Sequence, residues 1–217
     1  MMQVKILDQT PSILHQFLNE IRDDNYQKNN HLFRNNLKRI GEVMAYEISK
    51  SLVFEPKTIT TVLGKKESVD FSCQPVIISI LRAGLALHQG FLNYFDHAEN
   101  GFISANRINK NGEISIELAY KSLPNINHKT LIIADPMLAT GHSMVESLQQ
   151  LLSNHSPTQI HIATVVAAPE GVDYLKQKFN NLPITLWVAS KDKQLNEKAY
   201  IVPGLGDAGD LAYGTKQ

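Results

Sequence analysis

The chain has 217 residues, 43% of them hydrophobic, and its 21 basic and 21 acidic side chains give a formal net charge of zero. This length is enough for a single α/β domain whose core needs neither a metal nor disulfides. The neutral balance argues against nucleic-acid binding, and a single cysteine excludes an internal disulfide framework.

The sequence shows no apolar run near the roughly 20 residues that a bilayer span requires. Its first residues also lack the apolar core and the cleavage site of a signal peptide. We therefore expect a cytoplasmic protein that has no membrane partner. The eight histidines form no HExxH or similar pair, so no metal site built from protein side chains is expected.

The N-terminal region, residues 1–55, is predicted to be mainly helical scaffold, with helices over 12–22 and 30–52. Apolar residues recur in the second helix at spacings of three and four, which places them on one face. These residues are Phe33, Leu37, Ile40, Met44 and Ile48.

Residues 57–72 alternate polar and β-branched side chains around Gly64, Lys65 and Lys66, which predicts a β-hairpin. The sequence offers no helix to cover this hairpin. We therefore expect an exposed arm that reaches a partner subunit, in a homodimer or a larger homo-oligomer.

Residues 75–190 are predicted to form the core, because short apolar runs alternate there with helical patterns. Strands are expected at 75–81, 130–135, 159–168 and 183–190, and helices at 84–95, 141–152 and 169–179. This alternation predicts an α/β fold, with a mostly parallel sheet flanked by helices. Ligands of such sheets bind beyond the carboxyl ends of the strands. Residues 100–128 lie between the first two of these strands in the sequence. They are predicted to form two further strands, joined by a turn at 109–112, and to act as a flap near the edge of the sheet where ligands bind.

The run LIIADPMLATGHSM, residues 131–144, is predicted to be a buried strand, a small-residue loop and the start of a helix. Small side chains from Ala139 to Ser143 let successive backbone N–H groups converge on an anion, and Thr140 and Ser143 add hydroxyl donors. Because no lysine follows Gly141, the loop is not a Walker A motif. From the loop alone, an ordinary strand-to-helix turn in which Thr140 or Ser143 caps the helix is as good an interpretation as an anion site.

Asp135 favours the functional interpretation, since a carboxylate at this position can accept hydrogen bonds from two sugar hydroxyls. The stretch DPMLATG resembles the phosphoribosyl diphosphate (PRPP) motif of type I phosphoribosyltransferases, and in particular that of the uracil phosphoribosyltransferases, which have proline after the acid. The resemblance implies PRPP contacts from Asp135, Pro136, Met137, Leu138, Ala139, Thr140, Gly141, His142 and Ser143. His142 stands where the family often has glycine, and we expect its side chain to point to solvent.

Residues 204–209 match the dinucleotide fingerprint GxGxxG, yet this interpretation is rejected. The motif follows no first strand, and only eight residues follow Gly209, whereas an acid is needed about 20 residues on. Glycines here instead allow close approach of main-chain groups to a planar base. A plain glycine-rich loop is the alternative.

The segment AYIVPGLGDAGDLAYGT resembles the uracil-binding hood of the same family, here residues 191–217. The resemblance implies that uracil is bound by Tyr200, Ile201, Gly206, Asp207 and Ala208, chiefly through backbone groups. Asp207 would face the PRPP side of the site.

Two arginines are candidate ligands of the diphosphate. Arg82 ends an apolar strand, and its guanidinium suits bidentate binding of diphosphate. By resemblance it belongs to the pyrophosphate loop of the family. Arg107 aligns with a second arginine that the family places on PRPP, although its neighbours differ from the family pattern; the alternative is a surface arginine on a hairpin.

The resemblance covers nearly the whole chain. It implies transfer of the 5-phosphoribosyl group from PRPP to uracil, giving UMP and pyrophosphate, with Asp135, Arg82 and Asp207 as catalytic residues and Mg²⁺ carried mainly by PRPP. Two alternatives stay open: a phosphoribosyltransferase for another base, and a catalytically weak homologue that acts as a nucleotide-binding regulator.

Overall fold

A central sheet of eight strands organises the computed structural model, which describes residues 2–110 and 113–215, with the backbone alone for 105–119. The strands are β1 (Gln3–Ile6), β4 (Val76–Leu81), β5 (Asn100–Lys110), β6 (Glu113–Ser122), β7 (Thr130–Ala134), β8 (Met137–Leu138), β9 (Gln159–Ala167) and β10 (Ile184–Lys191). Their order is β1-β10-β9-β7-β4-β5-β6, with β8 also paired to β9. Apart from the antiparallel pair β5–β6, these pairings are parallel, which confirms the predicted mostly parallel sheet.

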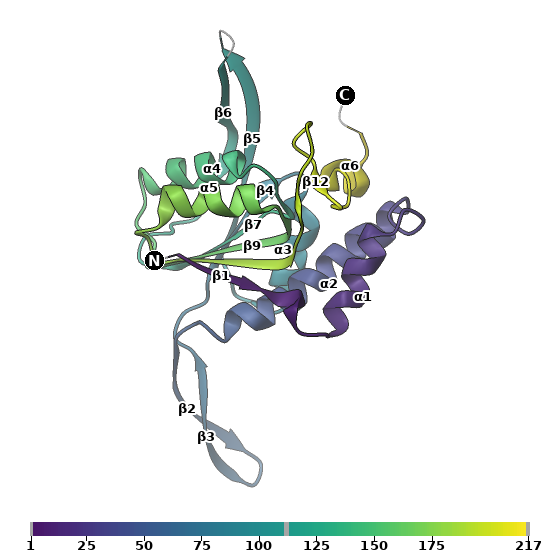
Figure 1. The fold of residues 1–217 in the computed structure, drawn as a ribbon. Coiled ribbons are helices and arrows are strands. Elements are labelled where there is room, and N and C mark those ends of the chain that lie inside the picture. Colours follow the sequence, from purple (N-terminus) through teal and green to yellow (C-terminus); the bar gives the residue numbers. More distant parts are fainter. Residues whose placement is uncertain (1, 111–112, 216–217) are drawn as a thin grey trace.

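Helices cover both faces of this sheet (Figure 1). One face packs against α1 (Ile13–Arg22), α2 (Asn30–Ser49) and α3 (Gly84–Leu92), and the other against α4 (His142–Leu152) and α5 (Pro169–Phe179). Side chains alternate between the faces along each strand: on β4, Ile77 packs toward α1–α3 and Ile78 toward α4 and α5. The apolar stripe predicted on α2 is buried throughout.

The N-terminal strand β1 was not expected, because residues 1–55 were predicted as helices. Gln3–Ile6 pairs in parallel with β10, Val4 lying opposite Leu186. A strand of four residues at the edge of a sheet is too short to produce a clear apolar alternation. The first part of the chain therefore contributes to the sheet as well as to the helical layer.

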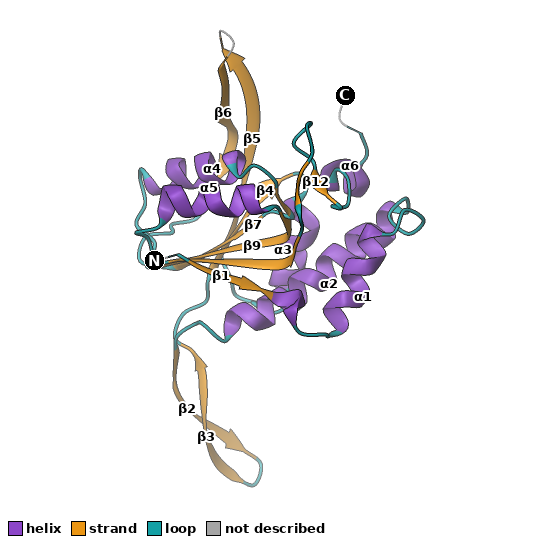
Figure 2. Ribbon diagram, viewed as in Figure 1, coloured by secondary structure: helices purple, strands orange, loops and turns teal. Residues whose placement is uncertain are grey.

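The predicted arm is a hairpin of β2 (Phe54–Thr61) and β3 (Gly64–Phe71) that projects away from the core (Figure 2). Its turn precedes the predicted Gly64, Lys65 and Lys66, which belong to β3. Thr61 pairs with Gly64 and leaves Val62 and Leu63 at the tip. The Thr61 hydroxyl holds this turn by accepting hydrogen bonds from the N–H groups of Leu63 and Gly64, at 3.2 and 3.1 Å.

The strands β5 and β6 form a second long hairpin on the opposite side of the molecule, as predicted for residues 100–128 (Figure 1). Residues 111 and 112 of the predicted turn lie outside the described residues. No helix in the described ranges is both long and apolar enough to cross a membrane.

The hood consists of a short antiparallel pair, β11 (Gln194–Leu195) and β12 (Ile201–Val202), followed by the helix α6 (Ala208–Tyr213). The sequence predicted a hood here, but no strand or helix within it. Asp207 begins the helix, since its carboxylate accepts a hydrogen bond from the N–H of Asp210 at 3.0 Å. Helix α6 packs against α2, which fixes the hood on the N-terminal helical layer.

Candidate active site

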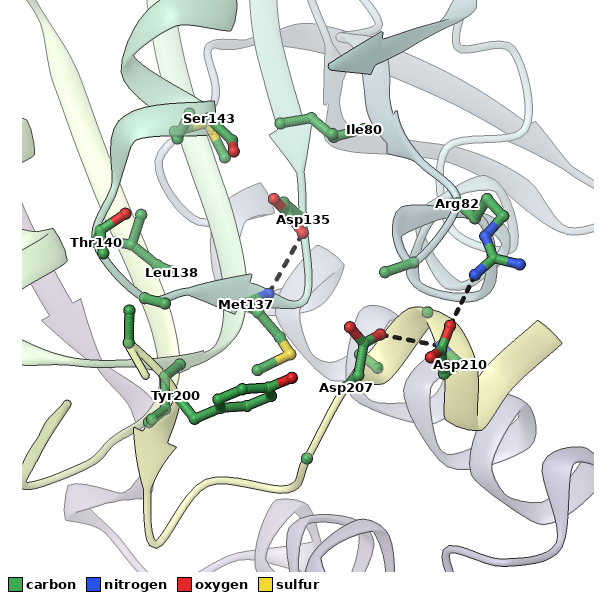
Figure 3. A pocket seen from close by; sticks show the side chains of 18 of the residues that line it. Ile80, Arg82, Asp135, Met137, Leu138, Thr140, Ser143, Tyr200, Asp207 and Asp210 are labelled. Atoms are coloured by element: carbon green, nitrogen blue, oxygen red, sulfur yellow. Dashed lines mark hydrogen bonds and ion pairs between the residues drawn. The ribbon is translucent and has the colours of Figure 1, made fainter. Parts of the chain in front are cut away.

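A cavity of about 720 Å³ opens beyond the carboxyl ends of β4 and β7, where the parallel sheet predicted a ligand site. Segments far apart in the sequence line it together (Figure 3). The predicted residues in its lining are Arg82, Asp135, Met137, Leu138, Ala139, Thr140, Gly141, Ser143, Tyr200, Ile201, Gly206, Asp207 and Ala208. The two motifs singled out in the sequence therefore converge on one cavity.

The stretch from Ala139 to Ser143, called the phosphate loop below, connects β8 to α4. Gly141 is the N-cap of α4 with φ +81°, a left-handed conformation that favours glycine. Within the described part of the chain, no side chain caps this helix. The ordinary capped turn is therefore wrong for Thr140 and Ser143, and the first N–H groups of α4 are arranged as in anion sites at helix N-termini.

A glycine of α5 gives the phosphate loop its shape. A Cβ added to Gly141 would lie 2.9 Å from the carbonyl oxygen of Gly171, and one added to Gly171 would overlap the carbonyl oxygen of Ala139. The loop and the first turn of α5 thus pack backbone against backbone. The sequence analysis missed Gly171, although a glycine inside a predicted helix is a signal of such close packing.

Pro136 and His142 do not contribute to the cavity lining. Pro136 is buried, and its carbonyl accepts hydrogen bonds from the N–H groups of Val165 and Val166, at 3.0 and 2.9 Å, so it ties the loop to β9. His142 is exposed, as expected, and its ring lies 4.6 Å from that of Tyr174. The side chain of Arg107 lies outside the described residues.

Asp135 lies just after β7, and its side chain faces the cavity. Its carboxylate accepts one hydrogen bond from the N–H of Met137, at 3.4 Å. Burial raises the pKa of Asp135 to about 7, and that single bond lowers it only in part. The carboxyl group is therefore poised between its two protonation states near neutral pH.

Arg82 follows β4 and is held by the hood. Its guanidinium donates to Oδ1 of Asp210 at 2.9 Å (Figure 3). It also donates to the carbonyl oxygen of Gly214 at 3.1 Å. Asp210 also lines the cavity, and the sequence analysis missed it. Its position three residues after the helix-capping Asp207 is the available signal, because acids are common in the first turn of a helix.

Residues 201–208, called the base loop below, form the opposite wall. Ile201 and Ala208 are buried, and Gly206 has a φ of +88°. Just before the loop, the Tyr200 side chain is 48% exposed, and Figure 3 shows its ring directed into the cavity. These residues offer main-chain groups and one aromatic face to a ligand.

The turn before the base loop adds Lys198 and Ala199 to the lining, which the sequence analysis missed. The side-chain oxygen of Asn196 accepts hydrogen bonds from the N–H groups of Lys198 and Tyr200, at 3.0 and 2.9 Å. Asparagine is a typical turn residue, so Asn196 was the signal for this turn.

Residues 7–215 match the family model described as uracil phosphoribosyltransferase. The chain belongs to the uracil phosphoribosyltransferase family. A relative of that name from Porphyromonas gingivalis is 47% identical over 99% of this chain and 100% of its own length. Another, from Methanococcus vannielii, is 40% identical over 95% of this chain and 88% of its own. A solved structure of an Aquifex aeolicus protein shares 32% identity and a TM-score of 0.84, covering 98% of both chains.

As a member of the uracil phosphoribosyltransferase family, the chain is an enzyme, a pentosyltransferase of pyrimidine salvage. It transfers the 5-phosphoribosyl group of PRPP to uracil, giving UMP and pyrophosphate. The comparisons give no support to the alternative of a catalytically weak nucleotide-binding regulator.

Proposed function

We propose that the cavity between the phosphate loop and the base loop is the site of this transfer, and that the whole chain works as one catalytic domain. The observation that carries the proposal is that residues from two distant stretches, 135–144 and 198–210, line a single cavity together. One wall is suited to a phosphate ester and the other to a flat base, which are the two ends of UMP.

The ribose 5-phosphate part of PRPP binds along the first wall. The phosphate accepts hydrogen bonds from the N–H groups of the phosphate loop, with hydroxyl donors from Thr140 and Ser143. Asp135, as a carboxylate, accepts hydrogen bonds from the two ribose hydroxyls. Pro136, Met137 and Leu138 join these two parts of the wall, and the backbone of His142 begins the helix that faces the phosphate.

Uracil binds against the second wall. Main-chain groups of Ile201, Gly206 and Ala208 bind the polar edge of the base, and the Tyr200 ring covers the site. A wall of backbone groups matches the alternating donors and acceptors of a neutral pyrimidine. The base loop, residues 201–208, has no cationic side chain to pair with the carboxylate of orotate, although Lys198 lines the cavity just before it. We therefore expect orotate to be the poorer substrate.

In the reaction, uracil N1 attacks C1 of the ribose as the bond from C1 to the diphosphate breaks, through a transition state with oxocarbenium character, and the N1 proton is released to solvent. No protein nucleophile takes part. Arg82 and Arg107 bind the diphosphate and take up its developing charge, while Asp207 faces the PRPP side. Since Arg82 is paired with Asp210 in the structure, it exchanges this carboxylate for the diphosphate when PRPP binds.

The side chains present fit a Mg²⁺ that enters with PRPP. In the described part of the chain, no three or more His, Cys, Asp or Glu side chains gather so as to hold a metal ion. Mg²⁺ retains several waters and prefers phosphate oxygens, so the diphosphate would hold it directly and Asp207 through water. Bound there, it supplies neutralisation of charge on the leaving group.

The arm of β2 and β3 is proposed to pair with a second copy of the chain in a homodimer or larger homo-oligomer, in the cytoplasm and without nucleic acid. Val62 and Leu63 at its tip are 100% and 97% exposed. Sedimentation should show an oligomer for the wild type and a shift toward monomer for Val62→Asp/Leu63→Asp. An unchanged oligomeric state in this variant would show that the tip of the arm is not part of the interface.

Turnover of labelled uracil with PRPP and Mg²⁺ tests the proposed function directly. We expect UMP and pyrophosphate in equal amounts. Hypoxanthine and orotate should compete with uracil poorly. Faster turnover of either base would overturn the assignment of the base loop to uracil.

A further inference from the structure

An ion pair between Arg22 and Asp192 lies behind the base loop, outside the cavity lining. Arg22 is the last residue of α1, and Asp192 directly follows β10. The two side chains meet in a bidentate pair, with Nη1 to Oδ2 and Nη2 to Oδ1 both at 2.9 Å. Their side chains are only 20% and 6% exposed, so the pair is largely shielded from water.

The same two side chains hold both backbone polar groups of Gly204. Arg22 Nη1 donates to the Gly204 carbonyl oxygen at 2.8 Å, and the Gly204 N–H donates to Asp192 Oδ2 at 3.0 Å. Arg22 Nη2 also donates to the hydroxyl of Ser190 at 3.1 Å, which ties the pair to β10. Ion pair and glycine therefore form one closed hydrogen-bonded unit.

Gly204 lies at the tightest point of the base loop. Its φ of +62° is left-handed, and a Cβ added there would overlap the carbonyl oxygen of Ile201. Ile201 on one side and Gly206 on the other both line the cavity. The orientation of the Gly204 backbone therefore sets how the neighbouring main-chain groups are directed toward a ligand.

The geometry points to Arg22 and Asp192 as positioning residues for uracil, which act through Gly204 without touching the substrate. This inference rests on the proposed assignment of the base loop to uracil. Because that loop reads the base with main-chain groups, the substrate is bound only if the backbone is held at a fixed angle.

Their effect should be confined to the base side of the site. The phosphate loop is held separately, by the close contact of Gly141 with Gly171 and by the tie of Pro136 to β9. A largely buried ion pair need not stabilise the fold as a whole, because apolar residues can often replace such a pair without lowering the free energy of unfolding. Its bonds to Gly204 instead indicate a role in orientation.

Two ligands separate the two sides of the site in a binding experiment: UMP occupies both, and ribose 5-phosphate occupies only the phosphate side. In Asp192→Asn and Arg22→Gln, we expect the Kd for UMP to rise about tenfold or more, because charge-assisted bonds to the loop are lost. The Kd for ribose 5-phosphate should stay within about twofold. Steady-state kinetics should show the same split, with a raised KM for uracil and a nearly unchanged KM for PRPP.

Arg34→Gln is the matched control. Arg34 also lies on an N-terminal helix and also donates to a hood carbonyl, that of Ala212 in α6, but it does not contact the base loop. Its loss should cost the hood a comparable bond while leaving the ratio of the two Kd values unchanged.

Equal weakening of both ligands, an unchanged Kd for UMP, or an equal effect of Arg34→Gln would overturn the inference. Loss of the folded state in both Asp192→Asn and Arg22→Gln, seen by circular dichroism, would also count against it, since the pair would then hold the whole fold. A wild type that binds both ligands but does not convert uracil would contradict the proposed function while leaving the positioning role measurable.

Discussion

The two walls of the cavity are built in different ways. The phosphate loop follows directly from a strand and leads into a helix, so neighbouring residues create it, and one glycine contact with α5 fixes it. The base loop lies in an appended hood, whose turn at Gly204 is held by Arg22, 182 residues away in the sequence, together with Asp192. One cavity can therefore combine a wall formed by residues that are neighbours in the chain with a wall that depends on tertiary contacts.

The largest effect is expected at Asp135, on the phosphate wall. Asp135→Asn replaces a carboxylate that we propose accepts hydrogen bonds from two ribose hydroxyls by an amide, whose single oxygen can accept them only in part. We expect kcat/KM for PRPP to fall about 100-fold or more, which corresponds to the loss of two charge-assisted hydrogen bonds. Steady-state kinetics measure this effect. Near-normal turnover by Asp135→Asn would contradict the proposal that Asp135 binds the ribose.

A smaller but still clear effect is expected from Gly171→Ala, which tests whether packing holds the phosphate loop. The added Cβ would displace Ala139, so the KM for PRPP should rise about tenfold, with a cost in stability of about 1–3 kcal/mol from overpacking. The KM for uracil should change little. Asp173→Ala, at an exposed position on the same helix, is the control; if both variants behave like the wild type, the loop does not depend on this contact.

The pH dependence of PRPP use sharpens the comparison further. Because the pKa of Asp135 is raised to about 7 and only the carboxylate accepts both hydroxyls, kcat/KM for PRPP should rise through about pH 7. Between the ordinary pKa of an aspartate and about 7, Asp135 is protonated in the folded state and ionised in the unfolded state. The free energy of unfolding should therefore fall as pH rises across this range. Asp135→Asn should abolish this loss of stability.

These pH effects are followed by initial rates and by thermal unfolding between pH 5 and pH 9. Asp135→Asn should lose the inflection near pH 7 in its remaining activity and have a higher Tm than the wild type at pH 8. An unchanged inflection in the variant would assign it to another group, such as the substrate phosphate.

The smallest effect is expected at His142. Its ring lies on Tyr174, outside the cavity lining, and only its backbone belongs to the phosphate wall. His142→Ala should therefore leave the KM for PRPP within about twofold of the wild type. A large increase would show that the imidazole turns toward the phosphate during catalysis.

Much of the fold could be predicted from the sequence because its buried strands are continuous apolar runs. The strands β4 and β7 and the stripe on α2 follow from residues that are neighbours in the chain. The strand β1 was missed because four residues give too little pattern. The helix α6 was missed because Gly209 lowers its intrinsic propensity, while its cap at Asp207 stabilises it.

In the candidate site too, some residues could be predicted from the sequence and others could not. Asp135 and the phosphate loop could be found because they are contiguous, and the base loop could be found by its resemblance to a family. Gly171 and Asp210 left only a local hint and Arg22 left none, since each acts through a partner that only folding brings close. Local sequence thus predicts contiguous groups of the cavity lining better than the distant groups that hold them in place.

A crystal structure of the enzyme with UMP tests the central claim most directly. The account predicts the phosphate at the N-terminus of α4, within hydrogen-bond distance of the backbone of residues 139–143, and the uracil ring against residues 201–208 of the same subunit. A nucleotide whose base lies away from the base loop, or whose phosphate lies outside the phosphate loop, would contradict it.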